Sequence, residues 1–349
     1  MNSIIDKVSV ISSFDFLPEI ESSTCKALLK YCEINPGHSL EFCQELFTEF
    51  YKFLSMHAAK LNKDHHSKVF PPVEIAKVWE FHIQNTAKYP LLCEKVNQKY
   101  IHYRPELYNF EDEAVERGLK ELYEETLSGV KAMFGALNQK VWVSFEKVKK
   151  GYQSTFNVSL KRLKNLLQDD STVNSKISQI IKKSFESANF SIPALKLVEK
   201  SEINTEAVEK IDKISFPKDF LQILCQKLLI SPEVAVTLLT EYKKFLLMSI
   251  ISQFPIAPSG FVDEVWHLHM LFTREYLETC KNLKGNVIVH VPLIENSVSE
   301  KENLQEFYQK TVQLYEKTFG KREEACWPEH GEKGVDAKLE HTFIWINSE

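Results

Sequence analysis

Apolar side chains recur every three or four positions along most of the chain, and this spacing predicts helices. Residues 40–54 place their apolar positions on one helical face, and residues 234–246 show the same pattern. Proline-bearing loops follow both stretches, and a proline just before a helix suits its first turn. Two later helices are expected to stop near Gly135 and Gly320, because glycine commonly ends a helix. The predicted fold class is mainly α, built from orthogonal helices with at most short extended segments.

The chain also repeats part of itself. Residues 78–93 and 265–280 share Val, Trp, His, Thr, Tyr and Cys at a constant offset of 187 positions. Similar residues continue the match on both sides, with small insertions. An ordered series of this length predicts two tandem copies of one helical module. A degenerate first copy is assigned to residues 1–148, the second copy to residues 205–335, and a tail to residues 336–349.

A basic connector separates the two predicted copies at residues 149–204. Over residues 149–200 it carries ten basic and four acidic side chains, a net charge of +6, whereas the whole chain carries −5. Leucines and isoleucines at helical spacing predict two amphipathic helices there. The charge is first interpreted as a solvated helical face, and alternatively as a docking surface for an acidic partner or nucleic acid. The basic residues assigned to this surface are Lys161, Arg162, Lys164, Lys182 and Lys183.

Composition narrows the class of protein. Hydrophobic residues make up 44% of the chain and charged residues 26%, which favours a folded core over disorder. Only 10 glycines occur, which argues against glycine-rich phosphate loops and many-stranded folds. No secretory signal, membrane span or Cys-x-x-Cys pair is visible, so the seven cysteines are expected to be reduced. We therefore expect an intracellular protein, with the cytoplasm as its main location and the nucleus as an alternative.

The repeated segment predicts a helix with a buried aromatic face. In the first copy its shared residues advance by three and four positions, so they lie on one side of the helix, and the second copy follows the same spacing. An apolar, aromatic face should pack inward, and a histidine on it needs a hydrogen-bond partner there. The residues assigned to the structural core are Trp79, His82, Tyr89, Trp266, His269 and Tyr276.

The second copy adds groups that could bind a metal ion or transfer protons. Asp263 and His267 are four residues apart, so their side chains are neighbours on the helix, and His269 and His290 complete the candidate metal ligands. His267 and His269 lie about 200° apart around a straight helix, so one helix cannot aim both at one ion. Alternatively, Asp263 has no metal to bind and lies in the first turn of the helix because the helix dipole stabilises a carboxylate there. These residues suggest a divalent metal as the one candidate cofactor, although a cofactor is not favoured. The sequence does not identify catalytic residues.

The second copy resembles a known family. Residues 259–269, which read Ser-Gly-Phe-Val-Asp-Glu-Val-Trp-His-Leu-His, and the following Tyr276 and Cys280 resemble the signature of the glycine-rich domain-containing protein-like family. The first copy resembles it only as a degenerate version. The core domain of that family has no settled biochemical activity, so the resemblance implies no reaction. Some plant members carry an RNA-binding-like motif and a glycine-rich tail, which this sequence does not match, so no RNA role is carried over.

The favoured hypothesis is that the chain is a non-enzymatic helical protein that binds or regulates a protein partner. The second copy is expected to carry this function. One alternative is a metal-dependent, hydrolase-like enzyme that uses the four candidate ligands. Another is nucleic-acid binding through the basic connector, which is the weaker partner hypothesis. Nucleophile elbows, Walker loops and dinucleotide-binding fingerprints are absent from the sequence. The identity of the ligand, the oligomeric state and the pathway do not follow from the sequence.

Overall fold

The chain folds into two compact units in a computed structural model. The structure describes residues 28–154, 191–198, 205–290 and 298–328, apart from residues 36, 98, 107 and 229. Among these, unit 1 contains the residues up to 153 except 103–106, together with residues 289 and 290. Unit 2 contains residues 103–106 and the other described residues after residue 153. Each unit therefore includes a short segment whose neighbours along the sequence belong to the other unit.

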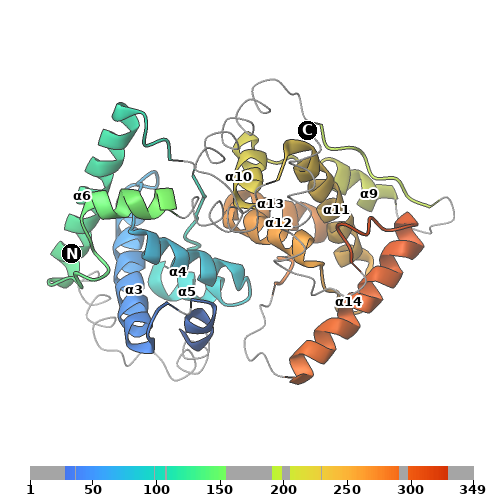
Figure 1. The fold of residues 1–349 in the computed structure, drawn as a ribbon, viewed down its shortest axis with the longest axis horizontal. Coiled ribbons are helices and arrows are strands. Elements are labelled where there is room, and N and C mark those ends of the chain that lie inside the picture. The colour runs from blue at the N-terminus through green and yellow to red at the C-terminus, as the bar shows by residue number, and fades with distance from the viewer. Residues whose placement is uncertain are drawn as a thin grey trace, which may run out of the picture. The chain divides into compact units, whose positions relative to one another are not determined.

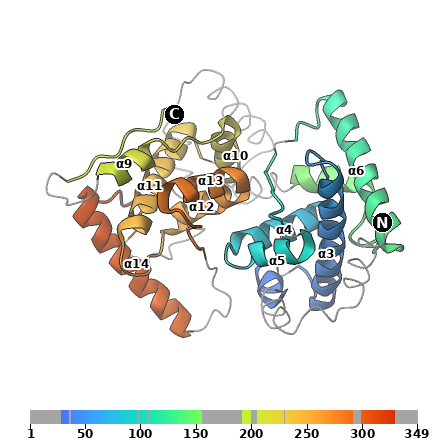
Figure 2. The same ribbon diagram turned by 180° about the vertical axis from the view of Figure 1, so that it is seen from behind.

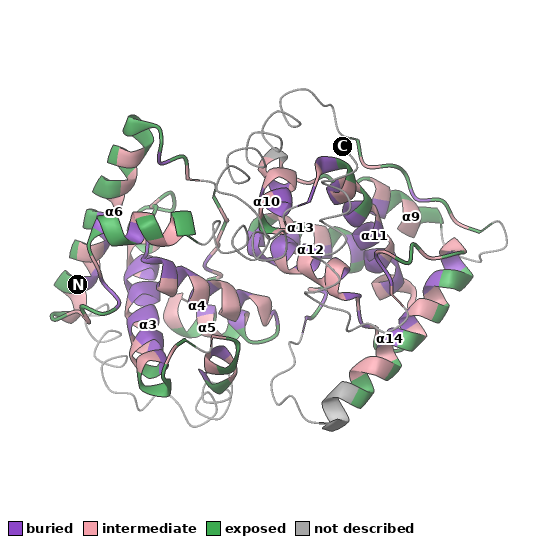
Figure 3. Ribbon diagram, viewed as in Figure 1, coloured by how far each residue is buried: buried purple, intermediate pink, exposed green. Residues whose placement is uncertain are grey.

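Unit 1 is a bundle around one long helix, α3. Its labelled helices are α3 (Leu40–Lys63), α4 (Val73–Gln84), α5 (Tyr89–Asn97) and α6 (Glu113–Phe134). Ser39 starts α3 by accepting a hydrogen bond from the amide of Phe42 on its side-chain oxygen. The apolar face of α3 packs against α4, α5 and α6 (Figure 1). Eleven of the 24 residues of α3 are buried as a result, whereas α6 buries only Tyr123, Thr126 and Val130 (Figure 3).

Unit 2 is organised in the same way around α11. Its helices are α9 (Thr205–Asp212), α10 (Lys218–Leu228), α11 (Pro232–Ile251), α12 (Gly260–Leu271), α13 (Thr273–Lys284) and α14 (Val298–Phe319). Ser231 caps α11 and Pro232 occupies its first turn, where a missing N–H costs nothing. α11 packs against α9, α10, α12 and α14, and these helices surround it when the chain is seen from behind (Figure 2).

The fold class predicted from the sequence, mainly α, is confirmed. Every regular element among the described residues is a helix, and residues 100–106 and 287–290 form neither a helix nor a strand. α6 and α14 end at Phe134 and Phe319, and the following Gly135 and Gly320 have φ angles of 77° and 83°. Only glycine adopts these angles readily, which explains both helix ends.

Within the described residues, no single helix is both long and apolar enough to cross a membrane, and α10 with α11 passes that test only as a pair bent by 105°.

A buried carboxylate holds unit 2 together. Glu241 on α11 is 3% exposed, and its Oε2 accepts hydrogen bonds from Trp327 Nε1 at 2.9 Å and from the Tyr315 hydroxyl at 2.9 Å. Lys244 Nζ lies 2.7 Å from Glu241 Oε1. The carboxylate thus joins α11, α14 and the segment after α14. A buried charge is tolerated here because both of its oxygens are paired.

Unit 1 contains two of these three contacts, those with a tryptophan and a lysine. Glu49 on α3 is 3% exposed, accepts a hydrogen bond from Trp142 Nε1 at 2.7 Å, and lies 2.8 Å from Lys52 Nζ. The two units therefore use the same chemistry to attach the segment that follows their last labelled helix.

Replacing the buried carboxylate should destabilise the chain. We expect Glu241→Gln to lower the free energy of unfolding by about 2–4 kcal/mol, because the amide loses the charge opposite Lys244 and brings N–H groups next to buried donors. Urea unfolding of the full chain measures the effect. Glu306→Gln is the control: Glu306 is an exposed partner of Lys310 on α14, so less than about 0.5 kcal/mol is expected. Equal losses in the two variants would contradict the assigned role of Glu241.

Candidate functional site

Asp263 and His267 form a pair on α12. Ser259, which is completely buried, caps this helix through its side-chain oxygen, so Asp263 lies in the first turn and His267 one turn later. Asp263 Oδ2 lies 3.4 Å from His267 Nε2, and the two side chains are 31% and 20% exposed. They are accessible and could offer one oxygen and one nitrogen ligand to a metal ion.

His269 has a different environment from this pair. It is 1% exposed, its Nδ1 lies 2.9 Å from the Tyr242 hydroxyl, and the rings of Phe216 and Phe220 pack around it. Burial lowers the pKa of His269 to about 3, so the imidazole is neutral at pH 7. The structure therefore places this candidate ligand in the core, on the opposite side of α12 from Asp263 and His267, as its spacing from His267 predicts.

His82 is the counterpart of His269 in unit 1, and it has a less complete environment. Phe50 stacks on it with ring centroids 4.9 Å apart and supplies no hydroxyl where unit 2 has Tyr242. Its Nε2 is buried and has no hydrogen-bond partner among the described residues. Burial lowers the pKa of His82 to about 4, so this imidazole is also neutral at pH 7.

His290 belongs to unit 1, whereas the other three candidate ligands belong to unit 2. Its Nδ1 lies 2.6 Å from the carbonyl oxygen of Gln84, which only accepts, so Nδ1 carries the proton. Within unit 2 the structure brings together Asp263 and His267 alone among the candidates, and the hypothesis of a metal-dependent enzyme stays a prediction. The basic residues Lys161, Arg162, Lys164, Lys182 and Lys183 lie outside the described residues.

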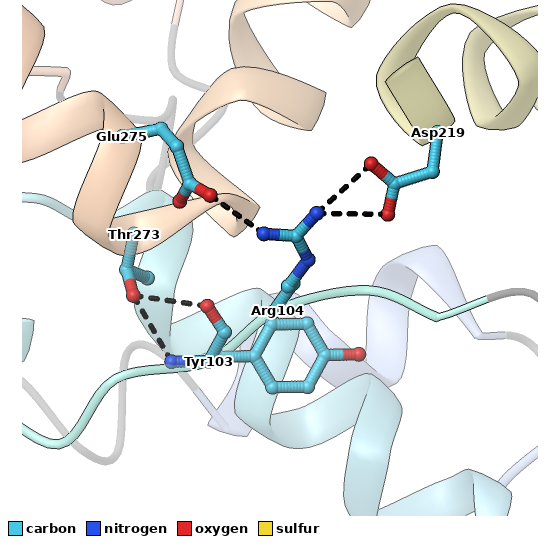
Figure 4. A network of polar contacts seen from close by, with 5 residues as sticks. All are labelled: Tyr103, Arg104, Asp219, Thr273 and Glu275. Atoms are coloured by element: carbon cyan, nitrogen blue, oxygen red, sulfur yellow. Dashed lines mark hydrogen bonds and ion pairs between the residues drawn. The ribbon is translucent and has the colours of Figure 1, made fainter. Parts of the chain in front are cut away.

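A threonine at the start of α13 holds the backbone of an extended segment. Thr273 Oγ1 accepts a hydrogen bond from the amide of Tyr103 at 3.0 Å and donates one to the Tyr103 carbonyl at 2.9 Å. The amide of Thr273 also donates to that carbonyl at 3.3 Å. Both backbone groups of Tyr103 are thereby paired on a single residue, as Figure 4 shows. We call this arrangement the threonine clamp.

The next residue of the segment inserts its charge between two acidic side chains. Arg104 Nη2 lies 2.9 Å and 3.0 Å from the two carboxylate oxygens of Asp219, and Nη1 lies 2.7 Å from Glu275 Oε1 (Figure 4). The guanidinium carbon stands 5.2 Å from the ring centre of Phe272, which is fully buried. We call Asp219, Glu275 and Phe272 the arginine cup. The two carboxylates of the cup and the guanidinium of Arg104 together carry a formal charge of −1.

Unit 1 contains a second threonine clamp. Thr86 Oγ1 accepts a hydrogen bond from the amide of His290 at 2.7 Å and lies 3.4 Å from the His290 carbonyl. Thr86 and Thr273 are 187 positions apart, and so are Tyr103 and His290. The same offset therefore relates both the clamping residues and the clamped ones.

Sequence reasoning missed the arginine cup. Asp219, Glu275 and Arg104 are separated by more than 50 positions from one another along the chain, and no local spacing links them. One signal was present in the sequence, because Thr86 and Thr273 are among the residues that the two predicted copies share. A hydroxyl retained on an aromatic, buried helix face indicates a polar partner there.

A family model described as UCP032817-like matches residues 206–317. The family is uncharacterised, so the match supports the resemblance of this part of the chain to a known sequence family and implies no activity. It bears neither on a glycine-rich domain nor on two tandem copies, which stay predictions. No curated protein and no solved structure is significantly similar to the chain.

Removing the buried imidazole should destabilise unit 2. We expect His269→Ala to lower the free energy of unfolding by about 1–3 kcal/mol, because the Tyr242 hydroxyl loses its partner and the surrounding rings lose contacts. Thermal or urea unfolding of the full chain measures this. His66→Ala, at an exposed position, should change stability by less than about 0.5 kcal/mol. An unchanged stability in His269→Ala would show that the imidazole is not packed as described.

Acid should weaken the fold through the same histidine. The unfolded chain binds a proton at His269 below about pH 6.5, whereas the folded chain does so only near pH 3, so stability falls with pH between these values. Between about pH 7 and pH 5 the wild-type chain should therefore lose about 1–2 kcal/mol more than His269→Ala. Urea unfolding at both pH values gives the difference, and parallel losses in the two proteins would refute it.

Proposed function

We propose that the protein is a non-enzymatic binding protein in which two copies of one helical module each hold an extended peptide segment. The observation that carries this proposal is the threonine clamp of unit 2, in which Thr273 pairs both backbone groups of Tyr103. The protein partner would present an extended segment of the same kind to this clamp.

Matching hydrogen bonds support the idea of two copies. In unit 2, Trp266 Nε1 donates to the Tyr276 hydroxyl at 3.0 Å, which donates to the Ile288 carbonyl at 2.5 Å. In unit 1, Trp79 Nε1 donates to the Tyr89 hydroxyl at 2.7 Å, which donates to the Ile101 carbonyl at 2.8 Å. Each relay ends two residues before the residue that a threonine clamps. The clamp is thus part of the module rather than an isolated contact.

Backbone pairing suits recognition of an extended segment. A hydroxyl both donates and accepts, so one threonine can replace the partner strand that a β-strand would need. Recognition through the main chain tolerates many sequences, and neighbouring side-chain sites then add specificity. In unit 2 the neighbouring site is the arginine cup.

The segment of residues 103–106 is the resident occupant of the unit 2 clamp. Because it is tethered to the same chain, it competes at an effective concentration on the order of millimolar. A partner would therefore bind weakly to the wild-type chain and more strongly once the resident segment is weakened. Arg104→Ala is the natural change, because Arg104 makes the contacts to the cup but none of the clamp contacts.

Binding of a peptide with the sequence of residues 101–107 tests the proposal. We expect a fluorescently labelled peptide to bind the full-length Arg104→Ala chain with a dissociation constant on the order of 10–100 μM, and the wild-type chain at least about tenfold more weakly. Adding Thr273→Val should reduce the affinity of the Arg104→Ala chain about tenfold, because valine keeps the shape of threonine but not its hydroxyl.

Thr273→Ser is the matched control, since it keeps the hydroxyl, and it should stay within about threefold of the Arg104→Ala parent. Circular dichroism and thermal unfolding verify that every variant is folded. The proposal fails if the peptide does not bind the folded Arg104→Ala chain below about 1 mM, or if valine and serine at position 273 bind it equally well.

A further inference from the structure

We infer that the arginine cup of unit 2 selects an arginine side chain in the extended segment of a partner protein. This inference rests on the proposed function, because it names the partner that the clamp would hold. Tyr103 and Arg104 are adjacent, so the clamp fixes the backbone of one residue and the cup receives the side chain of the next. A partner segment with the same order, a clamped residue followed by arginine, would fit both features at once (Figure 4).

The cup is shaped for a planar, forked cation. Asp219 receives one guanidinium nitrogen on both of its carboxylate oxygens, and Glu275 receives the other nitrogen. A lysine ammonium is a compact point charge and cannot span both carboxylates in this way. Phe272 adds a ring face 5.2 Å from the guanidinium carbon, a contact that arginine makes more often than lysine. The charge of the cup therefore favours a cation, and its shape favours arginine over lysine.

The two acidic residues are held in place by the helices that carry them. Asp219 lies in the first turn of α10 and Glu275 in the first turn of α13. A carboxylate is stabilised at this end of a helix by the dipole and the free amides, so the acidic pair is favoured before any cation arrives. The guanidinium then supplies the counter-charge. The pair is accessible to a partner, because the side chains of Asp219 and Glu275 are 37% and 27% exposed with Arg104 in place.

Backbone geometry selects the conformation of the partner segment. Pro105 follows Arg104, and a residue before proline is restricted to extended backbone. In an extended residue the N–H and the C=O point to the same side, so Thr273 can pair both groups of Tyr103 while the side chain of Arg104 enters the cup. The partner class is therefore an extended segment, with an arginine one residue after the clamped position. A helix would not present its groups in this way.

Four peptides with the sequence of residues 101–107 test the inference on the full-length Arg104→Ala chain, in which the cup is emptied of its own side chain. The position equivalent to residue 104 carries arginine, lysine, asymmetric dimethylarginine or alanine. We expect lysine and dimethylarginine each to bind at least about tenfold more weakly than arginine, although both keep the positive charge. Alanine should bind most weakly. Free L-arginine at about 10 mM should not displace the arginine peptide, because it lacks the backbone that the clamp holds.

Variants of the cup provide the reciprocal test. Asp219→Asn with Glu275→Gln, added to Arg104→Ala, should weaken the arginine peptide by about ten- to thirtyfold and the alanine peptide by less than about twofold. Both positions are partly exposed, so the variants are expected to fold, and thermal unfolding confirms it. Raised salt should weaken the arginine peptide more than the alanine peptide.

The outcomes separate this inference from the proposed function. Equal affinities for the arginine and lysine peptides, with both still dependent on Thr273, would overturn the selection of arginine and leave the peptide-binding function standing. Equal loss of the arginine and alanine peptides in the cup variant would also overturn the selection. If none of the four peptides binds the folded chain, the proposed function itself fails.

Discussion

A relay of hydrogen bonds from tryptophan through tyrosine to a backbone carbonyl determines where the functional features of each unit lie. In unit 2 the indole of Trp266, on the helix that also carries the candidate site, bonds to the hydroxyl of Tyr276 on the next helix. That hydroxyl bonds to the carbonyl of Ile288 in the extended segment. The relay is buried, so each lost bond would leave a desolvated polar group without a partner. Two helices and the start of the segment are thereby held in one relative position.

The relay also fixes the start of the segments that begin at Ile101 and Ile288. They have no sheet partner, so their backbone groups must be satisfied one residue at a time. The amide of Ile288 bonds to the thiol of Cys280 at 3.5 Å, and Ile101 bonds to Cys93 at 3.4 Å in the same way. Two residues later the threonine clamps pair the backbone of the next stretch. A thiol, a tyrosine and a threonine together replace a β-strand in an otherwise helical protein.

Unit 2 differs from unit 1 in polar groups at positions that correspond at the sequence offset described above. Phe50 stands where unit 2 has Tyr242, so the imidazole of His82 stacks on a ring, whereas the imidazole of His269 gains a hydroxyl. The arginine cup likewise adds charge beside a clamp that both units have. Differences of this kind change the polar groups of each unit, whereas both units keep a long buried helix at the centre.

Periodicity in the sequence was sufficient to predict most of the helices, because a helix depends on the spacing of apolar residues within one stretch of chain. The prediction of one continuous helix for the repeated segment was wrong: α4 ends at Gln84 and α5 begins at Tyr89, and α12 and α13 divide the second copy in the same way. The sequence pattern indicated that Trp266 and Tyr276 are buried, although they lie on two helices rather than on one helical face. It also indicated that Asp263 and His267 are neighbours, because they are one turn apart on a single helix. The separation of His269 from His267 also followed from helical geometry.

Only the tertiary structure decided which residues meet across the chain. Arg104, Asp219 and Glu275 come from three distant stretches, and each is an ordinary surface charge when its own helix or loop is considered alone. The assignment of His290 to one unit and of Asp263 to the other was equally invisible in the sequence. Such contacts depend on how whole helices pack, and packing is decided by the sum of many buried surfaces rather than by any local pattern.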